Sequence, residues 1–407
     1  MTALQLDMIQ SAGVGALALV LGMWLTRKIA FLQRFCIPSP VSGGIIFSFL
    51  TLALYLLADV EVSFDSALKD AFMVAFFTSV GFQTNLKVLR QGGRLLVLMV
   101  VLLVLMILMQ NTVSVSVAKV LDVNPLIGMA AGSISMTGGH GTAGGFASVL
   151  EGMGLTGAST IAMAAATFGL VAGSMIGGPL AERLISKKLT ARQKEMAAAP
   201  AMPESAPSVA SPCSHDQHES YAKATYSIIL VMAGGTLLSW LLAQTGVTFP
   251  TYFGALVLAA IVRNVMALSP KMEQHLDMDR IVSVGKICLF MFLGMAMASL
   301  RLWELQSLAL PLVLLLLIQI SLTTLFAYFV AFRLLGKDYD AAVLVAGFCG
   351  FGLGATPNAM ANMSAVCNKY HYTLNPFLLV PIVGGMVNDV INTGIITTFL
   401  NFFGECF

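Results

Sequence analysis

Two stretches decide the fold: NPLIGMAAGSISMTGGHGTAGGFASVL, residues 124–150, and DAAVLVAGFCGFGLGATPNAMANM, residues 340–363. Each is apolar enough to enter a bilayer, yet each carries clustered glycines and polar side chains near its middle. In the bilayer core, irregular backbone is tolerated only where it is buried in protein or lines a cavity. We therefore predict two re-entrant helical hairpins, over 124–150 and 340–367, each of which enters and leaves the membrane on one side.

The turn chemistry of both stretches supports this interpretation. Asn124 and Pro125 suit a helix cap and first helical position, and Asp338 or Asp340 can cap the second stretch. The helix is expected to break at the glycines, which are Gly138, Gly139 and Gly141 around His140, and then Gly350, Gly352 and Gly354. New helices are expected to start at Thr142 and at Thr356-Pro357.

Composition places the chain in the membrane class. Of its 407 residues, 57% are hydrophobic and 10% are charged, whereas a soluble domain carries about 25% charged residues. The apolar residues come in blocks long enough to cross a bilayer, which takes about 20 residues per helix. The net charge of +2 gives no reason to expect a nucleic-acid partner.

We predict an all-α polytopic membrane protein with about ten transmembrane helices. The expected spans are 9–31, 40–58, 68–83, 94–117, 158–181, 224–244, 250–268, 284–300, 308–332 and 376–400. With the N-terminus outside, all but three of the 22 basic residues fall on the cytoplasmic side, the exceptions being Lys69, Lys119 and Arg301. Because cytoplasmic loops are rich in Lys and Arg, we expect a multi-pass membrane protein with both termini outside.

Two halves of opposite orientation follow from this topology. Residues 1–184 and 223–407 each hold five spans and one hairpin, and residues 185–222 form a hydrophilic linker, expected to be flexible and cytoplasmic. FFTSVGFQTNLKVL (76–89) resembles LFMFLGMAMASLRLW (289–303), which supports an internal duplication. Inverted repeats with broken helices are typical of secondary transporters, whose substrate lies near the midplane at the repeat interface.

The hairpin tips are the predicted substrate site. A helix start inside the membrane presents unpaired N–H groups, which suit a small anion with carboxylates. Asn358 and Asn362 share one helix face and are expected to point at the substrate, and His140 could donate a hydrogen bond to a carboxylate. The candidate substrate-binding residues are Ser135, Thr137, Gly138, Gly139, His140, Gly141, Thr142, Gly352, Gly354, Ala355, Thr356, Asn358 and Asn362.

A cation site is predicted beside them. Asp389 is the one acidic residue near the middle of a predicted span, where an unpaired charge is costly and usually functional. Asn388 and Asn392 lie four residues apart, and hence on one helix face. The candidate cation-binding residues are Ser133, Gly81, Gln83, Asn85, Gly350, Asn388, Asp389 and Asn392.

With these motifs in hand, the chain resembles the glutamate:sodium symporter family. The likeness rests on SMTGGHGTAGG, GFGLGATP with its downstream Asn-Met, the VSGG turn and VGGMVNDVIN, and it runs from the first span to the last. It implies Na⁺-coupled uptake of L-glutamate across a bacterial inner membrane, with periplasmic termini and no cofactor besides the coupling ion. It also implies a homodimer in which a mobile substrate domain moves past a scaffold in an elevator-type alternating-access mechanism.

Three other functions can be compared with these features. The closest alternative is a Na⁺- or H⁺-coupled carrier of another small carboxylate, such as a hydroxy di- or tricarboxylate. An ion channel would usually arrange its re-entrant loops around a pore by oligomeric symmetry, whereas here both loops lie in one chain with opposite orientation. An enzyme is not expected, because no G-x-S-x-G, HExxH or similar arrangement is present.

Overall fold

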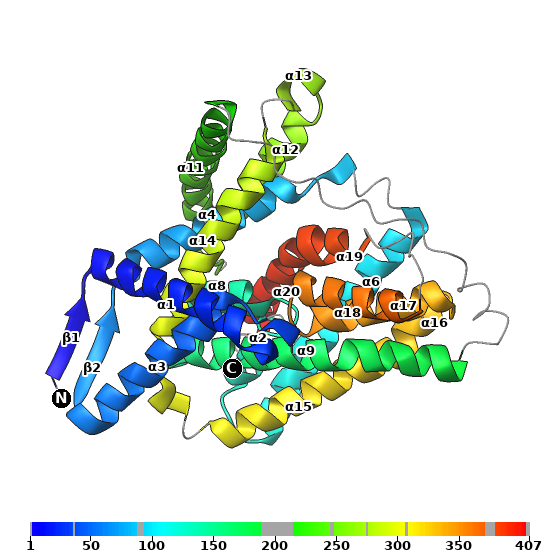
Figure 1. Cartoon of the computed structure of the whole chain (residues 1–407), viewed down its shortest axis with the longest axis horizontal. Coiled ribbons are helices and arrows are strands. Elements are labelled where there is room, and N and C mark those ends of the chain that lie inside the picture. The colour runs from blue at the N-terminus through cyan, green and yellow to red at the C-terminus, as the bar shows by residue number, and fades with distance from the viewer. Residues whose placement is uncertain are drawn as a thin grey trace.

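A computed structural model describes residues 2–35, 37–87, 93–188, 215–244, 248–273, 276–305, 308–370 and 379–403. Most of them are helical (Figure 1). Within them, seven helices are long and apolar enough to cross a membrane. These are α1 (Met8–Lys28), α3 (Ser39–Ala58), α6 (Gly93–Val120), α9 (Ala158–Lys188), α11 (His215–Ala243), α14 (Met278–Ala298), and α15 (Ala309–Phe326) with its continuations η2 (Ala327–Ala331) and α16 (Phe332–Leu334).

The other three predicted spans are shorter or interrupted. α4 (Ala67–Gln83) and α12 (Phe253–Met266) have 17 and 14 residues. The span predicted at 376–400 consists, where it is described, of α19 (Leu379–Pro381), the π-helical η4 (Ile382–Val387) and α20 (Asn388–Phe403). Short helices α2 (Ala30–Arg34), α13 (Pro270–Glu273) and η1 (Leu302–Leu305) complete the connections.

A small sheet corrects the all-α prediction. β1 (Thr2–Leu6) pairs in parallel with β2 (Val60–Phe64), with Thr2 opposite Val60 and Leu6 opposite Phe64. In β2 the residues Val60, Val62 and Phe64 alternate with Glu61 and Ser63, which is the period of a half-buried strand. The pairing ties the start of the chain to the segment that follows α3.

Six helices form one unit, which we name the scaffold bundle: α1, α3, α4, α11, α12 and α14. Two antiparallel pairs approach closely through glycine, because Gly43 of α3 lies against the Ala18 carbonyl of α1 and Gly235 of α11 lies against Ala255 of α12. Ser48 on α3 donates to the Met297 carbonyl of α14 at 2.6 Å. α4 packs between α12 and α14, so the pair α4–α14 runs through the centre of the bundle.

The remaining long elements form the core bundle, which comprises α6, α9, α15 and α20 with the two broken hairpins (Figure 1). Side chains such as Leu102, Met106, Val343 and Phe348 are fully or almost fully buried between α6 and α17 (Tyr339–Gly352). Buried amides also cross the bundle, since Gln319 on α15 donates to the carbonyl of Gln110 on α6 at 2.8 Å.

The linker between the halves is shorter than predicted. α9 continues to Lys188 and α11 already begins at His215, whereas the predicted linker covers residues 185–222. Its middle, residues 189–214, lies outside the described residues. The helical ends carry charged and polar residues, which extend each helix past its apolar part.

Candidate functional site

The first hairpin breaks earlier than its glycines suggested. α7 (Pro125–Ala131) starts as predicted, with the Asn124 side chain accepting from the Leu126 N–H at 2.9 Å. The chain then leaves the helix over residues 132–138 and resumes as α8 (Gly139–Gly152). The prediction that Thr142 caps this second arm is therefore wrong: the cap position is Gly138, and Thr142 lies one turn into the helix.

Side chains from distant helices hold the backbone of this break. Asn111 on α6 accepts from the Ser133 N–H at 2.9 Å, and Asn392 on α20 donates to the Ser133 carbonyl at 3.0 Å. One turn before Asn392, Asn388 donates to the Thr137 carbonyl at 2.9 Å. These amides replace the helical hydrogen bonds that the break forfeits, as an apolar interior requires.

The second hairpin is tighter. Asp338 caps α17 by accepting from the Ala341 N–H at 2.8 Å, which selects it over Asp340. The break is confined to residues 353–355, so Gly350 and Gly352 end α17 rather than interrupt it. α18 (Thr356–Tyr370) then begins where it was predicted, although the Ala355 carbonyl accepts its first hydrogen bonds, from the N–H groups of Asn358 and Ala359.

The tips of the two hairpins touch. A Cβ on Gly139 would lie 2.7 Å from the carbonyl oxygen of Gly354, and Gly139 has a φ of +60°. Both features require glycine. Beside this contact, the Gly352 carbonyl accepts from the Gln110 amide at 2.9 Å and from the Thr137 hydroxyl at 3.3 Å. The tips of the two hairpins, one from each half of the chain, thus meet inside the core bundle.

A cavity of about 530 Å³ opens at this meeting point. Its core-bundle wall contains many of the predicted site residues, which are Thr137, Gly138, Gly139, His140, Gly141, Thr142, Gly354, Ala355, Thr356, Asn388 and Asp389. The N-terminal turns of α8 and α18 both reach it, and among the described residues the N–H groups of His140, Gly141 and Thr356 have no hydrogen-bond partner there. The wall can therefore bind carboxylates.

The scaffold bundle supplies the opposite wall. α4 contributes apolar rings and one predicted residue, Gln83, while α14 contributes Leu289, Phe290 and Lys286. Among the lining residues, Lys286 is the one basic side chain and Asp389 the one acidic side chain. Sequence reasoning missed Lys286 because it counted the residue as a cytoplasmic charge at a helix start. Its place near the beginning of an apolar span was the available signal.

Four of the proposed substrate residues lie behind the cavity wall. They are Ser135, Gly352, Asn358 and Asn362. Asn358 donates to the Leu170 carbonyl at 2.8 Å and Asn362 to the Gly173 carbonyl at 2.9 Å, so both fasten α18 to α9. These two amides were expected to point at the substrate. In the structure they do not line the cavity, and their hydrogen bonds position the arm of the second hairpin.

The proposed cation residues divide in the same way. Gln83, Asn388 and Asp389 line the cavity, whereas Ser133, Gly81, Asn85, Gly350 and Asn392 do not. Gly81 lies in the contact between α4 and α12, against the carbonyl of Leu256. Asn85 caps its own turn by accepting from the Lys87 N–H at 2.9 Å. The glycine and asparagine at this end of α4 are therefore explained by packing and capping.

Unpaired oxygens gather around the first break. The Ser133 hydroxyl and the side-chain carbonyls of Asn388 and Asn392 are buried and have no hydrogen-bond partner among the described residues. Buried polar atoms are normally satisfied, and hard cations are bound by oxygen ligands, which include side-chain amide carbonyls. With the Asp389 carboxylate next to Asn388, the set fits a small desolvated cation.

The imidazole ring of His140 is oriented by a hydrogen bond with Thr167 of α9. Its Nε2 lies 2.9 Å from the Thr167 hydroxyl, which itself donates to the Met163 carbonyl at 2.9 Å. Since the Thr167 proton is used in that bond, Nε2 of His140 acts as the donor. The ring is thereby oriented at the cavity wall, with Nδ1 as its remaining polar atom.

A helical membrane protein whose two broken hairpins meet at a cavity falls in the class of secondary transporters. The family model described as sodium/glutamate symporter matches residues 4–372. The chain is 37% identical to the sodium/glutamate symporter of Escherichia coli (strain K12), over 97% of this chain and 98% of that protein. It is 35% identical to the one from Haemophilus influenzae, over 95% of each. The chain belongs to the sodium/glutamate symporter family.

A solved structure also aligns with the chain at low identity. The sodium proton antiporter MjNhaP1 from Methanocaldococcus jannaschii aligns with 98% of this chain and 99% of its own, at 15% identity and a TM-score of 0.44. So distant a likeness adds nothing about the site. Family membership makes the chain a transporter and not an enzyme.

Proposed function

We propose that this chain is a sodium-coupled carrier that imports L-glutamate across the bacterial inner membrane. The observation that carries the proposal is the meeting of the hairpin tips over a cavity with a single carboxylate, Asp389. Glutamate has two carboxylates, which match the two helix starts at the cavity wall, while Asp389 belongs with the cation site. The unpaired oxygens around Ser133 supply a place for Na⁺.

Alternating access would come from movement of the core bundle against the scaffold bundle. In support, where the bundles meet, aromatic rings lie on glycines: Phe292 of the scaffold over Gly144, and Tyr252 over Gly145 of α8. Such a surface offers few directional bonds to break, which favours sliding. An elevator of this kind carries the whole substrate site with the core bundle.

Orientation and repeat symmetry belong to the same proposal. The distribution of basic residues favours periplasmic termini and a cytoplasmic linker, which makes the cavity at the Gln83 end of α4 inward-facing. Matching pairs in the scaffold bundle, α1 with α3 and α11 with α12, support two inverted repeats of five spans each. We expect a homodimer, which chemical cross-linking in membranes would reveal.

Transport by the purified protein in proteoliposomes tests the function. Labelled L-glutamate should accumulate under an inward Na⁺ gradient and should not when K⁺ replaces Na⁺. Unlabelled citrate and malate serve as competitors. If these carboxylates accumulate and glutamate does not, the chain carries a hydroxy acid and the glutamate assignment is wrong.

A further inference from the structure

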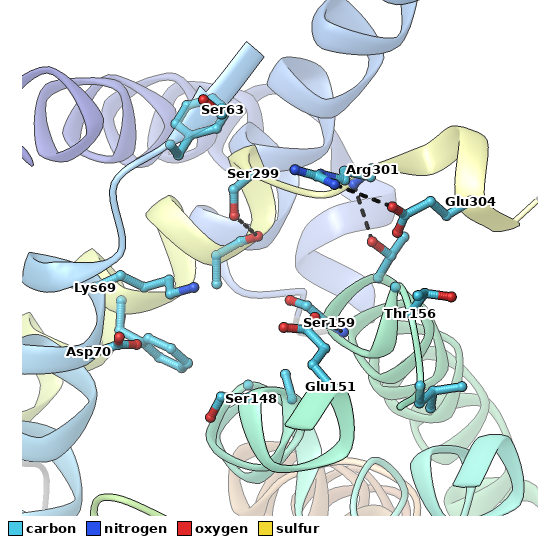
Figure 2. A pocket seen from close by; sticks show the side chains of 18 of the residues that line it. Ser63, Lys69, Asp70, Ser148, Glu151, Thr156, Ser159, Ser299, Arg301 and Glu304 are labelled. Carbon is cyan, nitrogen blue, oxygen red and sulfur yellow. Dashed lines mark hydrogen bonds and ion pairs between the residues drawn. The ribbon is translucent and has the colours of Figure 1, made fainter. Parts of the chain in front are cut away.

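A second pocket lies at the other end of the contact between the two bundles. It has a volume of about 450 Å³. Its scaffold wall is made by β2, the start of α4 and the end of α14, and its core wall by α8 and the start of α9 (Figure 2). We name it the outer pocket, since the proposed orientation puts it on the periplasmic side.

Three helices, α4, α8 and α14, line both the cavity and the outer pocket. Along α8, residues 138–142 line the cavity and Ser148 and Glu151 line the outer pocket. Along α4 the order is reversed, with Lys69 and Asp70 in the outer pocket and Gln83 at the cavity. A helix rises about 1.5 Å per residue, so the two ends of α4 are roughly 20 Å apart.

Between the two spaces lies a layer of aromatic rings. Phe77 of α4 stacks on Tyr252 with ring centroids 3.7 Å apart, and Phe146 of α8 meets the same ring edge-on at 6.3 Å. Phe77 lines the cavity, whereas Phe292 lines the outer pocket. The helix pair α4–α14 thus lines the cavity at one end and the outer pocket at the other, and aromatic rings separate the two spaces. We call these two spaces the chambers.

Each chamber holds one unpaired lysine of the scaffold bundle. Lys286 lines the cavity and Lys69 lines the outer pocket, and neither makes a hydrogen bond or ion pair with any described residue. Arg301, the other basic residue of the outer pocket, is already engaged by Glu61 at 3.3 Å and Glu304 at 3.6 Å. Lys69 and Arg301 are two of the three basic residues that the sequence places on the side opposite the cytoplasm.

Two acidic side chains, Asp70 and Glu151, line the outer pocket with Lys69, and neither forms an ion pair with it. Asp70 lies in the first turn of α4, where the helix dipole stabilises a negative charge without any lysine. Glu151 reaches into the outer pocket from α8 on the opposite side (Figure 2). Because α8 belongs to the core bundle, Glu151 would leave with it when the core bundle moves, while Lys69 stays.

We propose that Lys286 and Lys69 are two fixed charges of the scaffold that a dicarboxylic amino acid meets at the cytoplasmic and periplasmic ends of its path. The inference rests on the proposed function and extends it to residues outside the substrate-carrying bundle. Zwitterionic glutamate has a net charge of −1, so a lysine at each end attracts it. The core bundle carries the site, and the scaffold sets how readily the site loads on either side.

Transport kinetics from both sides test the proposal. In right-side-out vesicles, Lys69→Gln should raise the KM of glutamate uptake by about fivefold, the size expected for one charge in a wet cavity, and affect efflux less. Lys286→Gln should raise the KM of efflux in the same way and affect uptake less. Lys69→Arg and Lys286→Arg keep the charge and should restore the KM values.

Lys119→Gln is the matched control, since Lys119 is expected outside but lines neither chamber. Size-exclusion profiles show whether each variant is folded. If the wild type moves glutamate while both lysine variants keep normal KM values in both directions, the two-charge inference is wrong and the carrier assignment stands. If the wild type moves no glutamate, the proposed function fails and the inference falls with it.

Discussion

The first hairpin opens over residues 132–138 and the second only over residues 353–355, yet both tips end at the same cavity. The longer break leaves more backbone N–H and C=O groups without helical partners. Asn111, Asn388 and Asn392 reach it from α6 and α20 and supply those partners.

The shorter break is closed by packing instead. Gly350 of α17 lies against Ala359 of α18, and Gly347 lies against Met363, so the two arms form an antiparallel hairpin. The difference suggests a division of labour. The first break is a polar site with unpaired oxygens, which suits the ion, while the second is a packed arm whose helix start suits the substrate.

The contact between the two tips is the place where a substitution should have the largest effect. Gly139→Ala puts a Cβ 2.7 Å from the Gly354 carbonyl and forces alanine to a φ of +60°, which costs roughly 1–2 kcal/mol by itself. We expect glutamate uptake to fall to background. Gly152→Ala at the other end of α8 is the control, because its Cβ would meet no atom of the described residues within 4 Å. Normal uptake by Gly139→Ala would mean that the tips need not touch.

Asp389→Asn should have the next largest effect, and it probes the first break. The change removes the one carboxylate of the cavity wall and keeps its shape. We expect the Na⁺ concentration for half-maximal uptake to rise at least tenfold, which corresponds to about 1.4 kcal/mol of binding energy. Uptake measured over a range of Na⁺ concentrations checks this. Unchanged sodium dependence in a well-folded variant would remove Asp389 from the ion site.

Two asparagine variants compare the breaks directly. Asn392→Ala leaves the Ser133 carbonyl unpaired, whereas Asn362→Ala leaves the Gly173 carbonyl unpaired. Each should lower thermal stability, since an unsatisfied buried polar group costs about 1–3 kcal/mol. Only Asn392→Ala should also raise the Na⁺ requirement, by several-fold. If both variants shift it equally, the two breaks do not differ in ion binding.

The sequence predicted three of the four helix starts in the two broken segments because their caps are local signals. Asn124 and Asp338 cap the helices as their side chains suggest, and α18 starts at Thr356. The position of the first break could not be predicted, because two of the three asparagines that hold it, Asn388 and Asn392, lie more than 200 positions away in the sequence. Glycine is also ambiguous: Gly139 begins a helix here, although it lies in a run that suggested a break.

The site was predicted in part for the same reason. Residues at the tips line the cavity, as their place in the hairpin implied. Helical spacing puts Asn358 and Asn362 on one face but cannot say which neighbour that face meets, and it meets α9. The scaffold wall, with Lys286, depends on how two bundles pack, which no local pattern reports.

The smallest effect is expected at the C-terminal end of α18, which lies far from the tip of the second hairpin. Lys369 near the end of α18 pairs with Glu182 of α9 at 2.7 Å, and both side chains are exposed. Exposed ion pairs contribute little because water and salt screen them. Glu182→Gln should therefore leave the KM for glutamate and the sodium dependence unchanged, with thermal unfolding close to wild type. A clear rise in the KM for glutamate or in the Na⁺ requirement would show that the Lys369–Glu182 pair holds α18 in place, and that Asn358 and Asn362 do not suffice.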